Sequence, residues 1–391
     1  MASEILEILR KHVSYRRSCL NLQASENRLS DNALQAMGND MYARYSHVTD
    51  SGENSYGGSE FSDRVLSEAQ RIVASLYNAE YAEVRPIGGH IAAETVLLSI
   101  LPKGGSFLYI GPESGGYPGY DQPYLPDMLG YRSYRIPYDD KNQAIDLEGL
   151  STALERNRPD LIVLGQSAFV RPYDLRGVSQ IASDMHVPIV YDGSHVMGLI
   201  AGGEFQPDAL EYCAALYGST HKSFFGPQGG IILTNDGDLY NEIHRNTIWY
   251  TMDNYHPSRV AALAIAADEM KRHGKDYAKA LAKNSKSLAS GLYELGWEVR
   301  FPPWFSYSHQ VLLSGEFFSS RKITPVQFSQ RMESNRIIVD RDSRIGLSEA
   351  TRMGVSDMSK VASLMDRALQ GVKVVQEVSD LVSGLSMKFG D

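Results

Sequence analysis

Residues 217–230 read YGSTHKSFFGPQGG, and this stretch decides the fold class of the chain. It begins as a strand that ends in small hydroxyl residues, continues through His221 and Lys222, and closes in a loop rich in Gly and Pro. A second stretch, residues 190–195, reads VYDGSH and ends its strand in Asp192. Ligands of open α/β sheets bind at the carboxyl ends of the strands, so the Lys222 amine and the Asp192 carboxylate are expected to face one site.

Short apolar runs alternate with helical stretches on both sides of these two segments. Several runs are continuous rather than alternating in hydropathy, as expected for strands that are covered on both faces. Strand and helix alternating in this way predict an α/β fold with a mostly parallel sheet. The expected strands are residues 82–87, 106–110, 161–164, 188–191, 214–219 and 230–234, and the expected helices include residues 61–77, 89–101 and 178–185.

The chain is expected to have three parts. Residues 1–60 are rich in Asn, Ser and Tyr and are predicted to form an N-terminal arm or lid. Residues 61–256 carry the alternating pattern and are predicted to form a large ligand-binding domain. Residues 257–391 begin with a long helical stretch and continue into short strands and a closing helix, which predicts a smaller α+β domain.

The composition is that of an ordinary globular protein, with 43% hydrophobic and 22% charged residues. A net charge of −9 and the lack of a dense basic stripe argue against a nucleic-acid partner. No apolar run approaches the roughly 20 residues that span a bilayer, so no membrane partner is expected. The chain has two cysteines and its first residues show no signal-peptide core, which favours a cytoplasmic protein. Histidines occur singly, so no metal site is expected.

The pairing of Lys222 with Asp192 is what pyridoxal 5′-phosphate requires. A lysine amine forms the Schiff base, and a carboxylate pairs with the pyridinium nitrogen, so that the ring can accept electrons from a carbanion at Cα. Taken singly, Asp192 could be a turn residue and Lys222 a solvated loop lysine. Their occurrence together at two strand ends, with His195 close by in the sequence, favours the cofactor.

Several segments resemble serine hydroxymethyltransferases, in the same order along the chain. Residues 219–230 resemble the lysine segment of that family, T-T-T-H-K-T-L-x-G-P-x-G-G, and residues 192–202 resemble D-x-A-H-V-x-G-L-I-A-x-G. Residues 22–27 resemble I-A-S-E-N, and residues 56–61 resemble Y-G-G-C-E-Y. The resemblance implies the aminotransferase-like fold of the type I pyridoxal-phosphate enzymes, with a mostly parallel seven-stranded sheet, a smaller C-terminal α+β domain and pyridoxal 5′-phosphate as cofactor.

The resemblance also implies which residues hold the cofactor. Gly88, Gly89 and His90 take the place of the S-G-S phosphate loop, where backbone N–H groups at a helix N-terminus would bind the phosphate. Tyr117 takes the place of the histidine that stacks on the ring, and either aromatic can cover a pyridine face. A helix-entry turn and an ordinary buried tyrosine are the plain alternatives for these positions.

Four further positions complete the expected cofactor set. Ser167 matches the serine of S-A-Y, with a turn serine as the alternative. His195 would lie against the ring, and His221 precedes the lysine, although a structural histidine explains His221 equally well. Thr251 stands near the place where the glycine pair that reaches the partner subunit's phosphate is replaced in this chain.

The substrate carboxylate is expected to meet an arginine. Arg352 resembles the arginine of T-x-R-G, and a guanidinium can grip a carboxylate with two parallel hydrogen bonds. The register is off by one, because Met353 occupies the arginine position without a gap. Arg344 is therefore a second candidate, and Ser25 of the segment 22–27 is a third substrate-binding candidate. A surface salt bridge is the alternative for either arginine.

The departures from the family pattern point away from folate. His47 replaces the glutamate of K-Y-A-E-G, which moves protons at the substrate hydroxyl, and histidine can serve as acid or base near neutral pH. Tyr45 and Tyr56 are the next candidates for that role. The D-P-x-x-P-F stretch near the folate pocket is absent before Ser343, so no folate co-substrate is expected.

Two reactions on a β-hydroxy-α-amino acid remain. The favoured one is loss of the β-hydroxyl followed by addition at Cβ, as in cyclases that form capreomycidine- or streptolidine-type rings from hydroxylated arginines in antibiotic biosynthesis. The other is retro-aldol or transaldol cleavage, as in threonine aldolases and transaldolases. An inactive binding protein with the same fold is the alternative from another class. The resemblance also implies a homodimer, in which residues 45–56 reach the other subunit's cofactor.

Overall fold

The computed structural model describes residues 2–49 and 52–390, and these residues form two compact units. One unit contains residues 27–278 together with Gly390, and the other contains residues 2–26 and 279–389. The boundary near residue 278 falls inside a single long helix, α11 (Pro257–Glu294). The sequence-based boundaries at residues 60 and 256 stay predictions.

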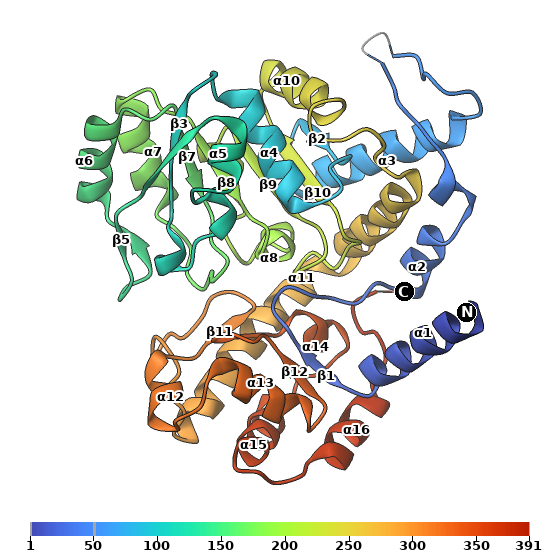
Figure 1. Cartoon of the computed structure of the whole chain (residues 1–391), viewed down its shortest axis with the longest axis vertical. Helices are drawn as coiled ribbons and strands as arrows, with labels where there is room; N and C mark the ends of the chain where they lie inside the picture. Colours follow the sequence, from blue (N-terminus) through green and yellow to red (C-terminus); the bar gives the residue numbers. More distant parts are fainter. Residues whose placement is uncertain (1, 50–51, 391) are drawn as a thin grey trace. The chain divides into compact units, whose positions relative to one another are not determined.

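A seven-stranded sheet forms the centre of the unit of residues 27–278 (Figure 1). Strand β10 runs antiparallel to β9 and β2, while the pairs β9–β8, β8–β7, β7–β3 and β3–β4 are parallel. The predicted α/β fold with a mostly parallel sheet is therefore confirmed. In order across the sheet the strands are β2 (Tyr81–Glu83), β10 (Gly230–Thr234), β9 (Ala215–Ser219), β8 (Ile189–Asp192), β7 (Leu161–Leu164), β3 (Ser106–Tyr109) and β4 (Arg132–Arg135).

Helices bury the apolar strands of this sheet. Helix α4 packs on β9 and β10, and its Leu97 joins a core that includes Phe107, Val163 and Val190 from three strands. The helices of this unit are α2 (Asp31–Met37), α3 (Glu60–Leu76), α4 (Gly89–Ile100), α5 (Leu125–Leu129), α6 (Leu147–Asn157), α7 (Leu175–Asp184), α8 (Met197–Ala201), α9 (Ala209–Tyr212) and α10 (Gly237–Thr247), with the short 3₁₀ turns η1 (Asp40–Ala43), η2 (Pro112–Ser114) and η3 (Pro118–Tyr120) and the ribbon β5 (Tyr138–Asp139)–β6 (Ala144–Ile145).

The second unit is built around two small sheets. Strand β1 (Leu20–Leu22) pairs in parallel with β12 (Ile337–Val339), and β11 (Gln310–Leu312) pairs antiparallel with β13 (Arg344–Gly346). The first residues of the chain therefore belong to the same compact unit as the C-terminal segment. The helices of this unit are α1 (Ala2–Arg17), α12 (Gly315–Ser320), α13 (Pro325–Glu333), α14 (Ser348–Arg352), α15 (Met358–Leu369) and α16 (Val375–Ser383).

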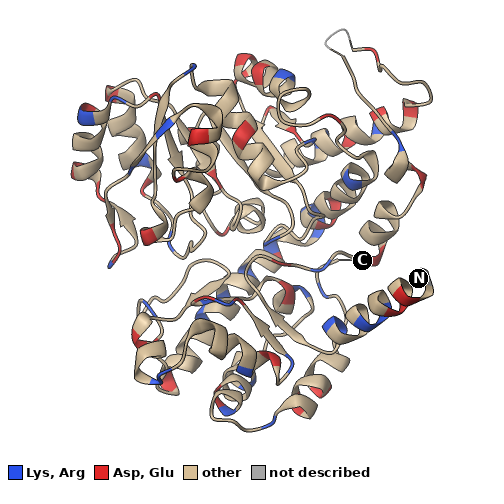
Figure 2. Cartoon of the chain, viewed as in Figure 1, with Lys and Arg blue, Asp and Glu red and all other residues tan. Residues whose placement is uncertain are grey.

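Strand β4 is absent from the sequence prediction. Its sequence, RSYR, places exposed arginines at both ends of an edge strand, and such a strand lacks the continuous apolar run that marks its buried neighbours. Basic and acidic residues are interspersed along both units in Figure 2. Within residues 2–49 and 52–390, no helix combines the length and the apolar character needed to span a bilayer.

Candidate active site

The ends of β8 and β9 bring the two segments singled out from the sequence side by side. Asp192 is the last residue of β8 and lies opposite Tyr217 of the parallel strand β9. Lys222 follows the last residue of β9 by three positions, in the turn at residues 220–224. The Ser194 side chain accepts a hydrogen bond from the backbone N–H of Ser219 (3.1 Å), which joins the two loops. Ser223 also donates its hydroxyl to the His195 carbonyl (2.7 Å). These two hydrogen bonds hold the loop of Asp192 next to the loop of Lys222, as the sequence predicted.

Hydrogen bonds within the loop of Lys222 fix its shape. The Thr220 hydroxyl donates to the Pro227 carbonyl (2.6 Å), and the Gly226 N–H donates to the Thr220 carbonyl (2.6 Å). Outside the loop, the Asn27 side-chain amide donates to the Lys222 carbonyl (2.9 Å) and to the Tyr277 hydroxyl (3.2 Å). Asn27 lies in the segment 22–27 noted in the sequence, and these contacts give its amide a role in fixing the lysine backbone.

The N-terminus of α4 offers backbone donors with no competing side chain. Gly88 caps this 12-residue helix in an extended conformation, and no side chain caps its N–H groups. Gly89 packs so closely on β9 that an added Cβ would lie 2.9 Å from the Ser219 Cβ. The helix start therefore abuts the strand that leads to Lys222, with its N–H groups arranged to receive an anion.

Tyr117 and Ser167 stand on two loops that are bonded to each other and to α4. The Tyr117 hydroxyl lies 2.9 Å from Nδ1 of His90, whose ring meets the tyrosine edge-on. Burial lowers the pKa of His90, while the charge of Asp192 raises it. The Gly115 carbonyl accepts the backbone N–H of Ser167 (2.7 Å).

Gly165 brings the end of β7 into contact with Asp192. Gly165, at the end of β7, has φ of +141°, and an added Cβ would lie 2.6 Å from the Asp192 Cβ. A residue with a side chain would be strained at such a φ, so only glycine lets β7 approach Asp192 this closely. Asp192, Lys222, Gly88–His90, Tyr117 and Ser167 thus stand on segments that contact one another in succession.

The sequence interpretation missed two tyrosines at Asp192, of which Tyr120 bonds to the carboxylate and Tyr217 bonds to Tyr120. The almost fully buried carboxylate accepts the Tyr120 hydroxyl at Oδ2 (2.7 Å) and the Ser194 N–H at Oδ1 (3.0 Å), and the Tyr217 hydroxyl lies 2.6 Å from that of Tyr120. Burial first, and then the charge of Asp192, raise the pKa values of Tyr120 and Tyr217 well above 10, so both hydroxyls stay protonated. The pairing of β8 with β9 places Tyr217 opposite Asp192, and neither segment indicates this pairing by itself.

The two histidines near the lysine differ in surroundings. His195 is buried in the loop after β8. Burial, together with the adjacent positive charge of Lys222, lowers the pKa of His221 to about 4, so that it is neutral at pH 7. Its buried Nδ1 has no hydrogen-bond partner within the described part of the chain. An orphaned buried nitrogen of this kind is satisfied when a polar group binds beside it.

His47, Tyr45 and Tyr56 belong to a second cluster, where residues 44–49 and 52–56 contact residues 249–254. The His47 and Trp249 rings lie 5.3 Å apart, and the Tyr45 and Tyr56 rings lie 5.2 Å apart. The Tyr45 hydroxyl donates to Asp253 (3.3 Å), whose charge raises the pKa of Tyr45.

Thr251 belongs to the same stretch but is engaged inside the unit. Its hydroxyl donates to the Thr247 carbonyl (2.8 Å) and lies 3.3 Å from the Thr95 hydroxyl on α4. Its expected role toward a partner subunit's phosphate stays a prediction.

The three expected substrate-binding residues lie in the other compact unit. Arg352, on α14, is fully buried, and its Nε donates to the Phe389 carbonyl (3.0 Å). Arg344, on β13, pairs with Asp340 (3.4 Å) and Asp342 (3.2 Å). Ser25 is half-buried in the turn that follows β1. Their role at the substrate carboxylate stays a prediction.

The residues at the sheet edge fit pyridoxal 5′-phosphate. The group needs an amine, an anion for its ring nitrogen and donors for its phosphate, and Lys222, Asp192 and the uncapped N-terminus of α4 provide them on contacting segments. The orphaned Nδ1 of His221 fits a bound polar group as well. Among residues 2–49 and 52–390, no three His, Cys, Asp or Glu side chains are grouped so as to hold a metal ion.

The sequence profile of serine hydroxymethyltransferase matches residues 1–335. The chain belongs to the serine hydroxymethyltransferase family. The serine hydroxymethyltransferase of Archaeoglobus fulgidus is 31% identical over 401 residues, which cover 99% of this chain and 91% of that protein. That of Methanothermobacter marburgensis is 32% identical over 398 residues, which cover 97% of this chain and 93% of that protein.

The fold also matches a solved structure closely. The crystal structure of L-threonine transaldolase from Pseudomonas fluorescens, in its internal aldimine state, superposes with a TM-score of 0.87 at 24% identity, over 98% of this chain and 92% of that one. As a serine hydroxymethyltransferase-family member of fold type I, the chain is a pyridoxal-phosphate enzyme of amino-acid metabolism that acts at Cα and Cβ of an amino acid. The predicted cofactor and enzyme class are confirmed.

Proposed function

We propose that this family member acts without folate on a β-hydroxy-α-amino acid whose side chain carries a positive charge. The favoured reaction is loss of the β-hydroxyl with intramolecular addition at Cβ, as for a hydroxylated arginine in antibiotic biosynthesis. The finer proposal rests on the cluster that surrounds His47. Retro-aldol cleavage of the same substrate is the competing reaction, because the family as a whole acts on the Cα–Cβ bond.

The observation that supports a positively charged substrate side chain is a group of exposed aromatic side chains beside a carboxylate. Tyr45, Tyr56, Trp249 and Tyr250 are exposed, and Asp253 accepts a hydrogen bond from Tyr45. Aromatic faces beside a carboxylate attract a guanidinium or an ammonium group through cation–π and charge interactions. Since His47 packs on Trp249 in the same patch, the proton-transfer candidate and the cation-binding groups come from one pair of loops.

Each residue has a definite task in this proposal. Backbone N–H groups at Gly88 and Gly89 would bind the phosphate, Asp192 would pair with the ring nitrogen, and Tyr117 would provide an aromatic face for the ring. Bound pyridoxal phosphate supplies a sink for the electron pair left at Cα. Lys222 takes the Cα proton, and His47 protonates the leaving β-hydroxyl so that it departs as water. A guanidinium nitrogen then bonds to Cβ and gives its proton to His47, which replaces the proton that His47 lost. Lys222 returns its proton to Cα, so the net change is loss of one water.

The test is a product analysis with β-hydroxyarginine. Mass spectrometry is expected to show a product lighter by one water, formed at the same rate with and without tetrahydrofolate. Glycine plus an aldehyde would instead establish retro-aldol cleavage and contradict the elimination. Folate-dependent hydroxymethyl transfer from serine at about 1 s⁻¹ or faster, typical of enzymes, would contradict the whole proposal.

A charge-neutralising variant tests the aromatic patch separately. Asp253→Asn is expected to raise KM for β-hydroxyarginine about tenfold, equivalent to about 1.4 kcal/mol, and to leave KM for threonine unchanged, since threonine carries no side-chain charge. Asp238→Asn, an exposed aspartate at the start of α10, is the matched control. An equal change of KM for both substrates would remove the patch from substrate recognition.

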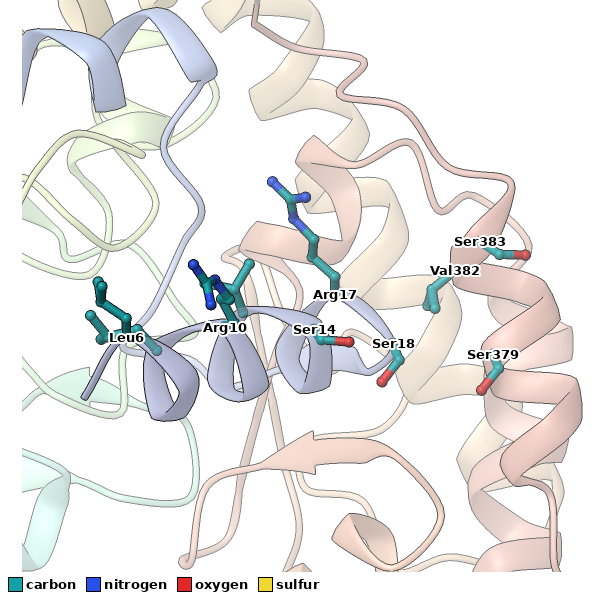
Figure 3. A pocket seen from close by; sticks show the side chains of 10 residues that line it. Leu6, Arg10, Ser14, Arg17, Ser18, Ser379, Val382 and Ser383 are labelled. Atoms are coloured by element: carbon teal, nitrogen blue, oxygen red, sulfur yellow. The ribbon is translucent and has the colours of Figure 1, made fainter. Parts of the chain in front are cut away.

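We infer that the active form is a homodimer. Helix α1 exposes the large apolar side chains Ile5, Leu6, Ile8, Leu9 and Val13. Leu6, Leu9 and Val13 line a cavity of about 630 Å³ together with Val382 of α16 and the basic side chains Arg10 and Arg17 (Figure 3). A second copy of the chain would remove this apolar surface from water, and it would also receive the exposed Tyr45 and Tyr56.

A further inference from the structure

Asp192 is the end point of a chain of two tyrosine hydroxyls. Tyr120 has a single hydroxyl hydrogen and donates it to Asp192 Oδ2 at 2.7 Å. The 2.6 Å contact between Tyr120 and Tyr217 then requires Tyr217 to donate to the Tyr120 oxygen. Hydrogen bonds run in one direction, from Tyr217 through Tyr120 to the carboxylate.

This arrangement sits where hydrogen bonds are strong. Tyr120 and Tyr217 are almost completely buried, and Asp192 is only 8% exposed. In such surroundings successive hydrogen bonds polarise one another, so Tyr217 strengthens the bond that Tyr120 gives to Asp192. The Ser194 N–H on Oδ1 fixes the other oxygen. A carboxylate offers about four lone pairs, and two of them remain for a ring N–H.

The groups around Asp192 are mostly hydroxyls that do not ionise near neutral pH. Burial raises the pKa values of Tyr120, Tyr217, Tyr173 and Tyr191 well above 10 and also raises that of Tyr117. The charge of Asp192 acts on the following groups: His90 of α4, Tyr117 and Tyr120 from the segment of η3, Tyr173 from the loop before α7, Tyr191 of β8 and Tyr217 of β9. The hydroxyls of Tyr173 and Tyr191 donate to Gln166 and Gln206 and not to Asp192. His195 and Lys222 stand on the loops that follow β8 and β9.

We propose that Tyr120 and Tyr217 are positioning residues that orient the Asp192 carboxylate for the ring nitrogen of pyridoxal phosphate. Tyr120 acts directly on the carboxylate, and Tyr217 acts only through Tyr120. The proposal depends on the cofactor alone and on no choice of substrate, so it stands or falls independently of the cyclisation reaction.

The experiment measures cofactor affinity by spectral titration of the apoprotein. Loss of one charge-assisted hydrogen bond predicts that Tyr120→Phe weakens binding of pyridoxal phosphate about tenfold. Tyr217→Phe weakens it less. The double variant binds no more weakly than Tyr120→Phe alone, because Tyr217 has no other route to Asp192. A double variant whose loss equals the product of the two single losses would overturn the relay.

A cofactor analogue separates positioning from general packing. In 1-deazapyridoxal phosphate a CH group replaces the ring nitrogen, so Asp192 has no N–H partner. Tyr120→Phe is therefore expected to leave the affinity for this analogue unchanged. Equal weakening of both cofactors, or no weakening of pyridoxal phosphate, would contradict the proposal.

The matched control is Tyr109→Phe. Tyr109 is buried in β3 and also donates to an aspartate, Asp121 (2.8 Å), but not to Asp192. This variant should retain the cofactor affinity of the parent protein. A loss equal to that of Tyr120→Phe would assign the effect to packing and overturn the assignment. Thermal unfolding of each apoprotein checks that all variants are folded at the temperature of the titration.

Discussion

His47 is the residue on which the proposed reaction depends most. Its ring lies against Trp249, its backbone N–H donates to the Asn54 side chain (3.3 Å), and its carbonyl accepts the Ser55 N–H (2.9 Å). The position is therefore structured by its own loop rather than extended freely into solvent. A histidine in such a place can deliver a proton to a leaving hydroxyl.

His47→Ala is expected to impair the step at Cβ and to spare the steps before it. Turnover at Cβ should fall roughly 10²- to 10⁴-fold, the usual effect of removing one general acid–base group. Exchange of the α-proton of alanine with solvent should persist, because Lys222 moves that proton; NMR in D₂O measures it. Near-normal turnover would make His47 an ordinary loop residue, and Tyr45→Phe and Tyr56→Phe would then be compared.

Site residues that belong to a local sequence motif could be predicted from the sequence. Site residues that depend on how the strands pair could not. Lys222 and Asp192 could be found because each ends a strand in a recognisable segment. Tyr217 matters because β8 and β9 pair so that it lies opposite Asp192. Tyr120 reaches the same carboxylate from a 3₁₀ turn far away in the chain. Pairing between distant segments is not encoded in either segment alone.

Among the elements, β2 ends in Glu83, which forms a buried ion pair with Arg85. Glu83 and Arg85 are almost inaccessible to solvent, and their side chains form a salt bridge, with His244 of α10 adjoining Glu83 at 3.5 Å. Burial alone would raise the pKa of Glu83. The charge of Arg85 and hydrogen bonds from His244 and Arg85 outweigh burial and lower it from 4.5 to about 2.

The stability of the protein should therefore depend on Glu83 in acid. A carboxyl group whose pKa is lower in the folded state contributes stability that is fully present above pH 4.5 and is lost as the pH falls through about 2. Urea unfolding across this range should show a loss of about 3 kcal/mol from this group. Glu83→Gln should be less stable at pH 7 and should lack this part of the pH dependence.

The control for Glu83 is an exposed ion pair. Glu68→Gln removes the partner of Arg71 on the surface of α3. Its effect on the unfolding free energy should be small at any pH, because solvent screens an exposed ion pair. If Glu83→Gln matches Glu68→Gln at pH 7, the buried pair does not stabilise the fold.

At the scale of the whole molecule, the proposed homodimer predicts that two subunits with different defects can complement each other. Mixing Lys222→Ala with His47→Ala protein should restore part of the lost activity, because a hybrid dimer would hold one site with both residues intact. Light scattering is expected to give the mass of two chains. A fully active monomer, or a mixture no more active than its components, would contradict shared sites.

The fold class was predictable across the molecule because continuous apolar runs and helical periods repeat along residues 61–256. The grouping of α1 and β1 with the C-terminal segment was not, since β1 is only three residues long and pairs with β12 more than three hundred residues away. The expected cytoplasmic location remains an expectation from the two cysteines and the N-terminal sequence.

Strand β4 also affects how molecules of this protein associate with one another. It forms one outer edge of the seven-stranded sheet, and an open edge invites strands from other molecules to pair with it. Arg132 and Arg135 project from its two exposed ends, and Arg135 is held by Glu113 and Asp121 and lies over the ring of Tyr109. A strand from a second copy would have to displace these large charged side chains before it could pair with β4, so this edge resists the growth of sheets between molecules.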